Sequence, residues 1–186
     1  IMLDVFMGYH DQEEDITGIF ERAEEASAEG TQIPGEAPDI AQVKAMRKDQ
    51  SDCFFGPNVI KICQAADVVF MALHGENGEN GKIQAAFDLF GIQYTGSRYL
   101  GSALAMDKGI SKKMFEAAGI PTPHGISMSK AQRGVPFAET GLSLPCVVKP
   151  CCGGSSIGVT IVRTEDEFKS ALDEAFKWED NLIIEE

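Results

Sequence analysis

Residues 146–162 constrain the fold of this chain more than any other stretch of it. Two short runs, residues 146–148 and 159–162, are rich in β-branched side chains and have the length of β-strands. Pro150 and three glycines punctuate the gap between them. Two strands joined by so short a connection predict a β-hairpin with a glycine-serine loop at its tip.

The loop of this hairpin has the composition of a phosphate-binding element. Small residues such as Gly154 let backbone N–H groups approach a ligand closely. Ser155 and Ser156 add two hydroxyls, and Lys149 places an ammonium just before the loop. A polyphosphate needs donors of these kinds. An ordinary flexible hairpin tip has a similar composition, but Lys149 and a second lysine-bearing motif upstream favour the phosphate interpretation.

A second glycine-rich segment, residues 74–81, follows an apolar run at residues 67–73 that we expect to be a buried, parallel strand. Glycines at every third position predict a tight loop at the carboxyl end of that strand, where open α/β sheets bind their ligands. His74 and Glu79 could bind or orient a small polar substrate there. Alternatively, His74 caps the strand and Glu79 faces water.

This second loop matches neither common nucleotide-binding motif. A P-loop would need Ser or Thr after Gly81-Lys82, where the chain has Ile83, and a glycine where it has Glu76. The Gly-x-Gly-x-x-Gly fingerprint is also absent. A nucleotide site in this chain must therefore be of another type.

The order of elements predicts an α/β protein with two domains, residues 1–106 and 107–186. In the first domain, helices that begin near residues 57 and 83 alternate with short strands, which indicates an open parallel sheet. The second has strand signals near residues 125, 146, 159 and 182 and one helix, which Thr164 and Glu167 start as a capping box. We expect this second part to be a small α+β lobe with antiparallel strands.

Composition excludes several classes of function. The formal net charge of −13 argues against non-specific nucleic-acid binding, and no apolar run has the length of a membrane span. The five cysteines form neither a disulfide framework nor a zinc motif, which is typical of a reduced, cytoplasmic protein. Residues 1–5 and 181–186 both look like strands cut at a chain end, so we expect a fragment of a longer protein.

Four motifs, in this order, resemble the D-alanine–D-alanine ligases of the ATP-grasp superfamily. They are HGxxGExGxIQ from His74, AMDK ending at Lys108, VKPxxxGSSxGV from Val148, and IE ending at Glu185. The resemblance extends from His74 to the end of the chain, and residues 1–66 share only the general pattern. It implies an N-terminal pre-ATP-grasp domain followed by an ATP-grasp lobe.

The resemblance also implies roles for individual residues. Lys108 and Lys149 match the two lysines that bind the phosphates of ATP. Gly154, Ser155 and Ser156 match the loop that closes over the phosphates and the first substrate, and Ser155 matches a serine that orients groups around the first D-alanine.

Two further pairs have counterparts in the family. Glu185 and the backbone of Glu186 match the start of the segment that holds adenine. His74 and Glu79 match a histidine and an acid beside the first D-alanine. Asn80 and Gly153 depart from the usual family residues at their positions, without removing a main catalytic group.

The reaction that this resemblance implies has two steps. The carboxylate of one D-alanine attacks the γ-phosphate of ATP, and the amine of a second D-alanine then displaces phosphate from the acyl phosphate. Mg²⁺ neutralises charge on the phosphates. In the family its carboxylate ligands lie in a C-terminal lobe beyond these residues, so we expect the 186-residue chain alone to be inactive. The resemblance also leads us to expect a homodimer for the full-length ligase.

Three alternatives remain open at this stage. The second substrate could be D-lactate or D-serine, because the residues that select it lie outside this sequence. Another ATP-grasp carboxylate–amine ligase fits less well, since the His74 motif is typical of the D-alanine branch. A non-catalytic ATP-binding module would have had no need to keep Lys108, Lys149, Ser155 and Ser156.

Overall fold

The computed structural model describes residues 18–21, 24, 35, 39, 41–42, 45, 50, 53–56 and 58–186. The chain divides into two compact units, one of Ile1–Phe70 with Asp88–Thr95 and one of Met71–Phe87 with Gly96–Glu186. The strand expected over residues 1–5 lies outside the described residues. The predicted boundary between residues 106 and 107 stays a prediction.

In the first unit, helix α4 (Val59–Ala65) confirms the helix expected after residue 57. Residues 67–73 are not the buried strand that their composition predicts. Val69 forms a single parallel bridge with Tyr94, and the side chains of Val68 and Phe70 are more than half exposed. An apolar run is buried only when other elements cover both its faces, and the sequence of the run does not specify those neighbours.

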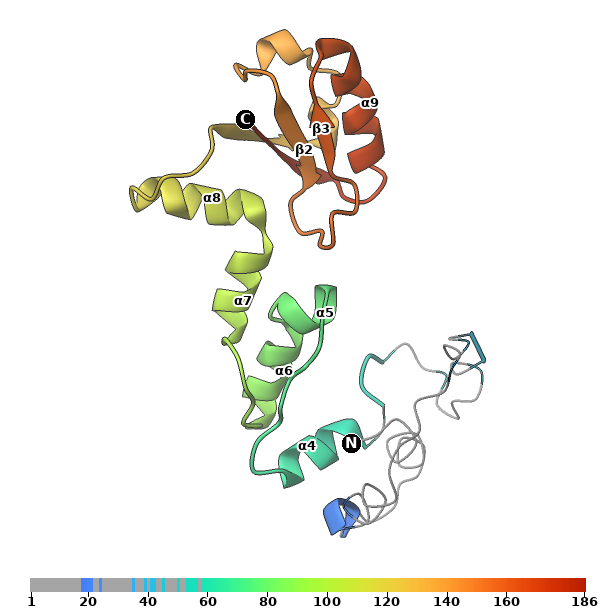
Figure 1. Cartoon of the computed structure of the whole chain (residues 1–186). Coiled ribbons are helices and arrows are strands. Elements are labelled where there is room, and N and C mark those ends of the chain that lie inside the picture. Colours follow the sequence, from blue (N-terminus) through green and yellow to red (C-terminus); the bar gives the residue numbers. More distant parts are fainter. Residues whose placement is uncertain are drawn as a thin grey trace. The chain divides into compact units, whose positions relative to one another are not determined.

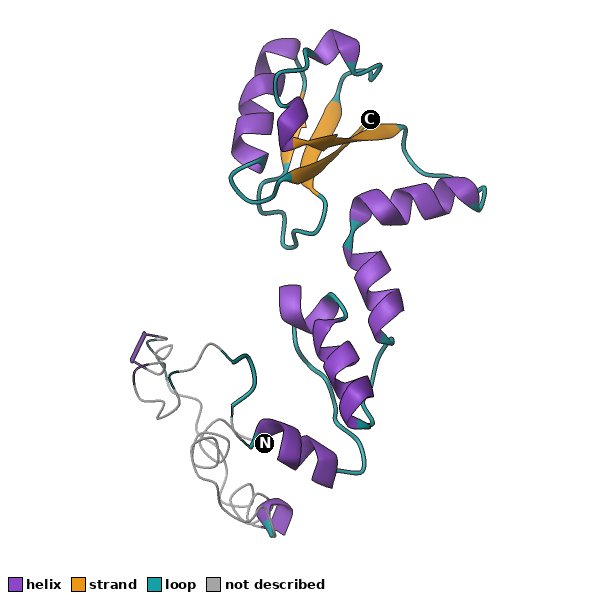
Figure 2. Cartoon of the chain, turned by 180° about the vertical axis from the view of Figure 1, so that it is seen from behind, coloured by secondary structure: helices purple, strands orange, loops and turns teal. Residues whose placement is uncertain are grey.

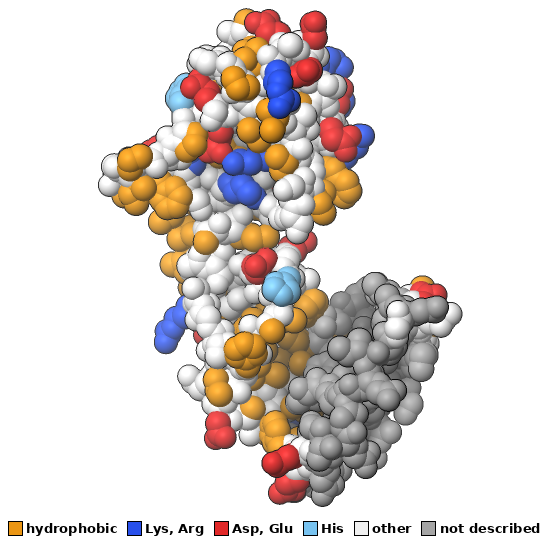
Figure 3. Space-filling model, viewed as in Figure 1, with side chains coloured by type: hydrophobic (Ala, Val, Ile, Leu, Met, Phe, Trp, Pro, Cys, Tyr) orange, Lys and Arg blue, Asp and Glu red, His pale blue; other side chains and the backbone are white. Residues whose placement is uncertain are grey.

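The helices that precede the sheet are α5 (Glu76–Glu79), α6 (Lys82–Phe90, which runs into the first unit), α7 (Tyr99–Met106) and α8 (Lys108–Ala117). Helix α6 confirms the helix expected near residue 83. Asp107 starts α8, because its carboxylate accepts a hydrogen bond from the backbone N–H of Ile110. Met114 and Phe115 of α8 are exposed, and hydrophobic side chains gather over the end of this helix (Figure 3).

A four-stranded antiparallel sheet follows, as predicted for residues 107–186. Its strands are β1 (Gly125–Ser129), β2 (Cys146–Pro150), β3 (Thr160–Val162) and β4 (Asn181–Glu185), in the order β1-β4-β2-β3 (Figure 1). Strands β2 and β3 form the predicted hairpin, and β4 pairs with β1 on one side and β2 on the other. Two short 3₁₀ helices, η1 (Lys130–Gln132) and η2 (Phe137–Glu139), connect β1 to β2.

Helix α9 (Glu165–Ala175) covers one face of this sheet (Figures 1 and 2). Thr164 and Glu167 form the predicted capping box at its start. Its inward side chains are buried against those of β2, β3 and β4, among them Phe168, Leu172, Val148, Val162 and Ile184. Because side chains alternate along a strand, the residues between these core positions face the opposite side of the sheet, where α8 contacts β4.

Candidate active site

A cavity of about 320 Å³ lies on the side of the sheet opposite α9. Residues from α7, α8, the segment before β1, and strands β2 and β4 line it. Its polar lining residues are Lys108, Ser111, Lys112, Thr122, Lys149 and Glu185, and its apolar ones are Ala105 and Phe115. The cavity therefore collects three lysines in a chain whose formal net charge is −13.

Strand register brings Lys149 and Glu185 together in the cavity wall. Lys149 pairs with Ile183 across the β2–β4 ladder, so Glu185, two residues further along β4, is its diagonal neighbour on the same face. Lys149 Nζ lies 2.5 Å from Glu185 Oε2. The Lys149 side chain is 25% exposed and that of Glu185 13% exposed, so solvent screens this pair only partly.

Glu185 uses its second oxygen for another lysine of the cavity. Its Oε1 lies 3.1 Å from Lys112 Nζ. Burial alone would raise the pKa of Glu185, but the hydrogen bonds from Lys149 and Lys112 outweigh it and lower the pKa below its ordinary value of 4.5. The carboxylate is therefore ionised at neutral pH and holds both ammonium groups.

Gly125 provides the space that the Glu185 side chain needs. It stands opposite Glu185 in the β1–β4 ladder, and a Cβ atom at this position would come within 2.8 Å of Glu185 Cγ. The same Cβ atom would come even closer to the Ile184 carbonyl oxygen, so a larger residue would have to displace the backbone of β4 as well as the Glu185 side chain.

Lys108, the other lysine predicted to bind phosphate, lies at the start of α8 beside the root of the β2–β3 loop. Its Nζ donates to the carbonyl oxygens of Cys151, at 3.1 Å, and Gly153, at 2.5 Å. The backbone N–H of Lys108 also donates to the Cys151 carbonyl, at 3.0 Å. These contacts join the first turn of α8 to the loop.

Residues 151–159 form the β2–β3 loop and hold the predicted serines at its tip. Ser155 and Ser156 are exposed and both adopt left-handed backbone conformations, with φ values of 53° and 59°. Only a few per cent of non-glycine residues do so, because the side chain is crowded in that region. Gly154 is also exposed, and its carbonyl accepts the N–H of Ile157.

The thiols of Cys151 and Cys152, at the root of the loop, both have raised pKa values. Burial, together with the nearby carboxylates of Asp107 and Glu179, raises the pKa of Cys151 to about 11. Burial and a hydrogen bond with Glu179 raise the pKa of Cys152 to about 12. A thiol is nucleophilic only as the thiolate, so neither cysteine has the properties of a catalytic nucleophile.

Glu186 directly follows β4, which is an inner strand of the sheet. Its backbone N–H donates to the His124 carbonyl at 2.9 Å, and its carboxylate accepts the Ser143 N–H at 2.7 Å. The hydrogen bonds from Ser143 and His124 lower the pKa of Glu186. The side chain therefore links β4 to the segments before β1 and β2.

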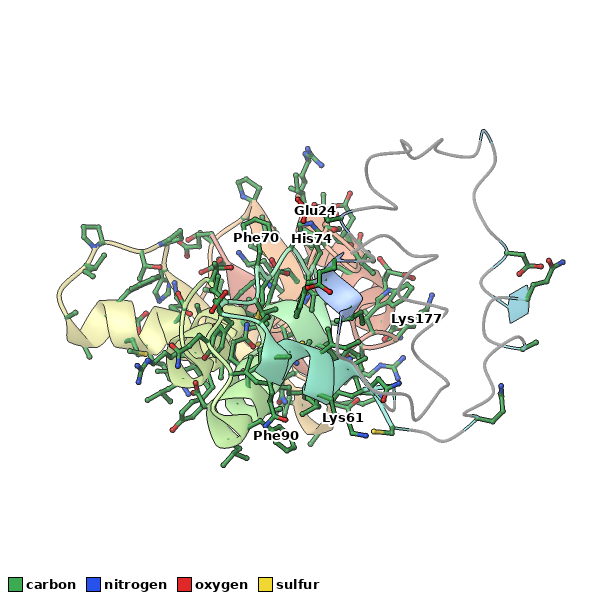
Figure 4. The ribbon with its side chains drawn as sticks, turned by 90° about the horizontal axis from the view of Figure 1, so that it is seen from below. Glu24, Lys61, Phe70, His74, Phe90 and Lys177 are labelled. Carbon is green, nitrogen blue, oxygen red and sulfur yellow. The ribbon has the colours of Figure 1, made fainter. Side chains whose placement is uncertain are left out.

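The segment with His74 and Glu79 forms a helical turn, α5, where the glycine spacing predicts only a loop. The Glu79 carboxylate accepts the backbone N–H of Gly75 at 2.9 Å and so closes the turn. Gly78 has to be small, since a Cβ atom there would come within 2.6 Å of the Leu73 side chain. His74 is exposed (Figure 4), and neither His74 nor Glu79 is among the residues that line the cavity.

Two family profiles together match most of the chain. The one described as D-ala D-ala ligase N-terminus covers residues 7–97, and the one described as D-ala D-ala ligase C-terminus covers residues 114–186. The chain belongs to the D-alanine–D-alanine ligase family. The predicted resemblance is confirmed over the part where the motifs occur and also over much of the first 66 residues.

Individual members of the family agree with this assignment. The D-alanine–D-alanine ligase of Lacticaseibacillus casei is 39% identical over 99% of this chain and 50% of its own length. The crystal structure of the Bacillus anthracis D-alanine–D-alanine ligase complexed with ATP is 38% identical, with a TM-score of 0.61 over 69% of this chain and 43% of that chain. The VanG D-Ala:D-Ser ligase of Enterococcus faecalis is 37% identical, with a TM-score of 0.61 over 65% of this chain and 36% of that one. The chain thus spans about half the length of the curated relatives that it matches.

Lys112 is the charged residue lining the cavity that the motifs did not reveal. It follows Lys108 by four residues, so both lie on the same face of α8. That spacing was a usable signal, because a second lysine one turn after the lysine predicted to bind phosphate lines the same cavity. Its burial could not be predicted, since Glu185 lies 73 residues away in the sequence.

The described part of this ligase chain contains no cluster of three or more His, Cys, Asp or Glu side chains that could hold a metal ion. Among the same residues, no helix has both the length and the apolar character needed to cross a membrane.

Proposed function

We propose that the full-length protein containing this chain is an ATP-dependent ligase that joins two D-alanines into D-alanyl-D-alanine for peptidoglycan precursors. The observation that carries the proposal is the cavity with Lys108, Lys149 and Glu185 in its wall, next to a glycine-serine loop. Family membership and the similarity to a ligase whose structure contains ATP support it.

The cavity has the size and charge of a polyphosphate site. Its volume of about 320 Å³ falls within the usual range for small-molecule pockets. Lys149 and Lys108 currently contact oxygen atoms, those of Glu185 and of the Cys151 and Gly153 carbonyls. In our proposal, phosphate oxygens of ATP replace these partners, and the two ammonium groups stabilise the charge that moves during phosphoryl transfer.

The remaining nucleotide contacts come from the loop and from the end of β4. Gly154, Ser155 and Ser156 close over the phosphates, with their backbone N–H groups and two hydroxyls as donors. Glu185 and the backbone of Glu186 begin the segment that holds adenine. The cavity-facing carboxylate of Glu185 connects this segment to Lys149.

His74, Glu79 and Ser155 serve the first D-alanine in this proposal. Its carboxylate oxygen attacks the γ-phosphorus of ATP, the bond to the β-phosphate oxygen breaks, and ADP leaves an acyl phosphate behind. The amine of the second D-alanine then attacks the acyl carbon and releases inorganic phosphate. The contribution of the enzyme is to position the reactants and neutralise charge, which can supply most of the acceleration in reactions of this kind.

Mg²⁺, when bound, would neutralise charge on the phosphates of ATP. Because the described residues contain no cluster of metal ligands, we assign none of the metal contacts to them. Our proposal places those ligands in the part of the family's length that this chain does not span.

The proposal extends to the organisation of the protein. Residues 1–106 form the substrate-side domain with an open parallel sheet, and residues 107–186 form the central ATP-grasp lobe. The parallel bridge between Val69 and Tyr94 is the observation that supports the parallel sheet. We further propose that the full-length ligase is a cytoplasmic homodimer that binds neither nucleic acid nor membrane.

A panel of amino acids tests the reaction. Purified full-length protein receives ATP and one amino acid at a time, and phosphate release is recorded. We expect release with D-alanine and not with L-alanine, and D-alanyl-D-alanine as the product. Since the VanG D-Ala:D-Ser ligase is 37% identical to this chain, D-serine with D-alanine is the second arm. Release that is independent of D-alanine would refute the proposal.

A further inference from the structure

Lys112 is a buried cation whose hydrogen-bonding capacity is fully used inside the protein. Its side chain is 6% exposed. Its ammonium contacts Thr122 Oγ1 at 3.2 Å, Glu185 Oε1 at 3.1 Å and the Pro123 carbonyl oxygen. A lysine ammonium has three N–H donors, so these three acceptors leave none for a ligand.

Lys149 differs from Lys112 in the exposure of its side chain and in the number of partners of its ammonium group. Its side chain is four times as exposed, at 25% against 6%, and its ammonium pairs with one carboxylate oxygen of Glu185. It retains donors that could turn to a phosphate. Glu185 therefore connects a saturated, fixed lysine to an available one, with Oε1 on the first and Oε2 on the second.

This connection has a consequence for nucleotide binding. A carboxylate in the wall of a phosphate site repels phosphate and competes for the lysine that should bind it. If Glu185 had only Lys149 as a partner, ATP would have to break that pair and leave a poorly solvated carboxylate uncompensated, which is costly. With Lys112 on Oε1, the carboxylate keeps a charged partner while Lys149 turns to the phosphate.

We propose that Lys112 is a positioning residue for ATP, which holds the Glu185 carboxylate in place and so lets Lys149 exchange it for a phosphate oxygen. The inference rests on the proposed ATP-dependent ligase function, since it assigns a role within the same cavity. The role of Lys112 concerns the affinity of the protein for ATP, and we expect Lys112 to make no contact with D-alanine.

The test compares the full-length protein with its Lys112→Met variant, which keeps the length of the side chain and removes its charge. We expect the KM for ATP to rise about tenfold, as is typical within one ion-pair network, and the KM for D-alanine to change less than about twofold. ATP titration by calorimetry gives the same change in Kd without relying on turnover. Lys113→Met is the matched control, because Lys113 is the adjacent, exposed lysine of α8 and should leave both constants unchanged.

A double variant separates positioning from a general structural role. Lys112→Met combined with Glu185→Gln removes both charges of the buried pair, which proteins tolerate better than the loss of one. If Lys112 acts through Glu185, the double variant and Glu185→Gln alone will have the same Kd for ATP within about twofold. This comparison remains available if Lys112→Met alone does not fold.

Two results would overturn the inference while the proposed function stands. One is an equal loss of ATP and D-alanine affinity in Lys112→Met, and the other is an effect of Lys112→Met that adds in full to that of Glu185→Gln. If the proposed function itself is wrong, the experiment gives another result: the unmodified protein will neither bind ATP nor release phosphate with D-alanine.

Discussion

Lys149 and Glu185, diagonal neighbours on strands β2 and β4, form an ion pair of 2.5 Å in the wall of the cavity. The pair contains a lysine predicted to bind phosphate and a glutamate predicted to begin the adenine segment. A second lysine, Lys112, holds the other oxygen of the same carboxylate. The electrostatics of the site therefore depend on one ionised glutamate.

The first prediction concerns acid stability. Glu185 has a lowered pKa, so its ion pairs contribute stability that is present in full above its ordinary pKa of 4.5 and is lost as the pH falls through the lowered value. We expect the unfolding free energy of the wild type to fall more steeply below pH 4.5 than that of Glu185→Gln. Urea unfolding at successive pH values measures this. Glu116→Gln, at an exposed position of α8, should retain the wild-type slope; parallel curves for wild type and Glu185→Gln would contradict the prediction.

The second prediction concerns the anchor of the β2–β3 loop. Gly158 has a φ of 71°, and a Cβ atom there would lie 2.8 Å from Trp178 Cδ1 and 3.0 Å from Pro150 Cγ. Gly158→Ala should therefore lower the unfolding free energy by about 1–3 kcal/mol, as overpacking typically does. Gly154→Ala is the control, because nothing lies within 4 Å of that position. Trp178, the single tryptophan of the chain, reports the unfolding by fluorescence. Equal losses in both variants would rule out the proposed contact.

The third prediction concerns the cysteines at the loop root. Because the pKa of Cys152 is raised to about 12, only roughly one molecule in 10⁴ carries the thiolate at pH 8. Iodoacetamide should therefore label Cys152 far more slowly than the exposed Cys53, as followed by peptide mass spectrometry. Glu179→Gln should accelerate labelling of Cys152, since it removes the nearby negative charge. Similar rates at Cys152 and Cys53 in the wild type would show that the thiol is not protected.

The hairpin and the lobe around it were predictable because their signals are local. The signals are the β-branched runs on both sides of residues 149–158, the Thr164–Glu167 capping box and the apolar stripe of α9. Each signal comes from residues that are close together in the sequence. Each signal specifies an element without reference to distant parts of the chain. The antiparallel β2–β3 pair follows from the short connection.

The cavity was harder to predict because its residues come together through register. That Lys149 and Glu185 share a face depends on β4 inserting between β1 and β2, a topology that no local pattern specifies. For the same reason, no local pattern predicts that Lys112 of α8 is buried while the apolar side chains of Met114 and Phe115 are exposed. Helical periodicity identifies which side chains share a face and leaves open which face becomes buried.

The fourth prediction separates the two substrates. His74→Ala should raise the KM for D-alanine more than the KM for ATP, because the motif assigns His74 to the first D-alanine and the residue does not line the lysine cavity. Steady-state kinetics on the full-length protein, with each substrate varied in turn, provide the comparison. A larger effect on ATP than on D-alanine would remove His74 from the amino-acid side of the site.

The central claim is that the cavity beside Lys149 binds the phosphates of ATP, and Lys149→Ala in the full-length protein tests it most directly. Phosphate release with D-alanine, measured over a range of ATP concentrations, should show a higher KM for ATP and a lower kcat, because the lysine would stabilise both the bound nucleotide and the charge that develops during transfer. Lys113→Ala, at the exposed lysine of α8, should behave as the wild type. Unchanged kinetics for Lys149→Ala would contradict the assignment of this cavity to ATP.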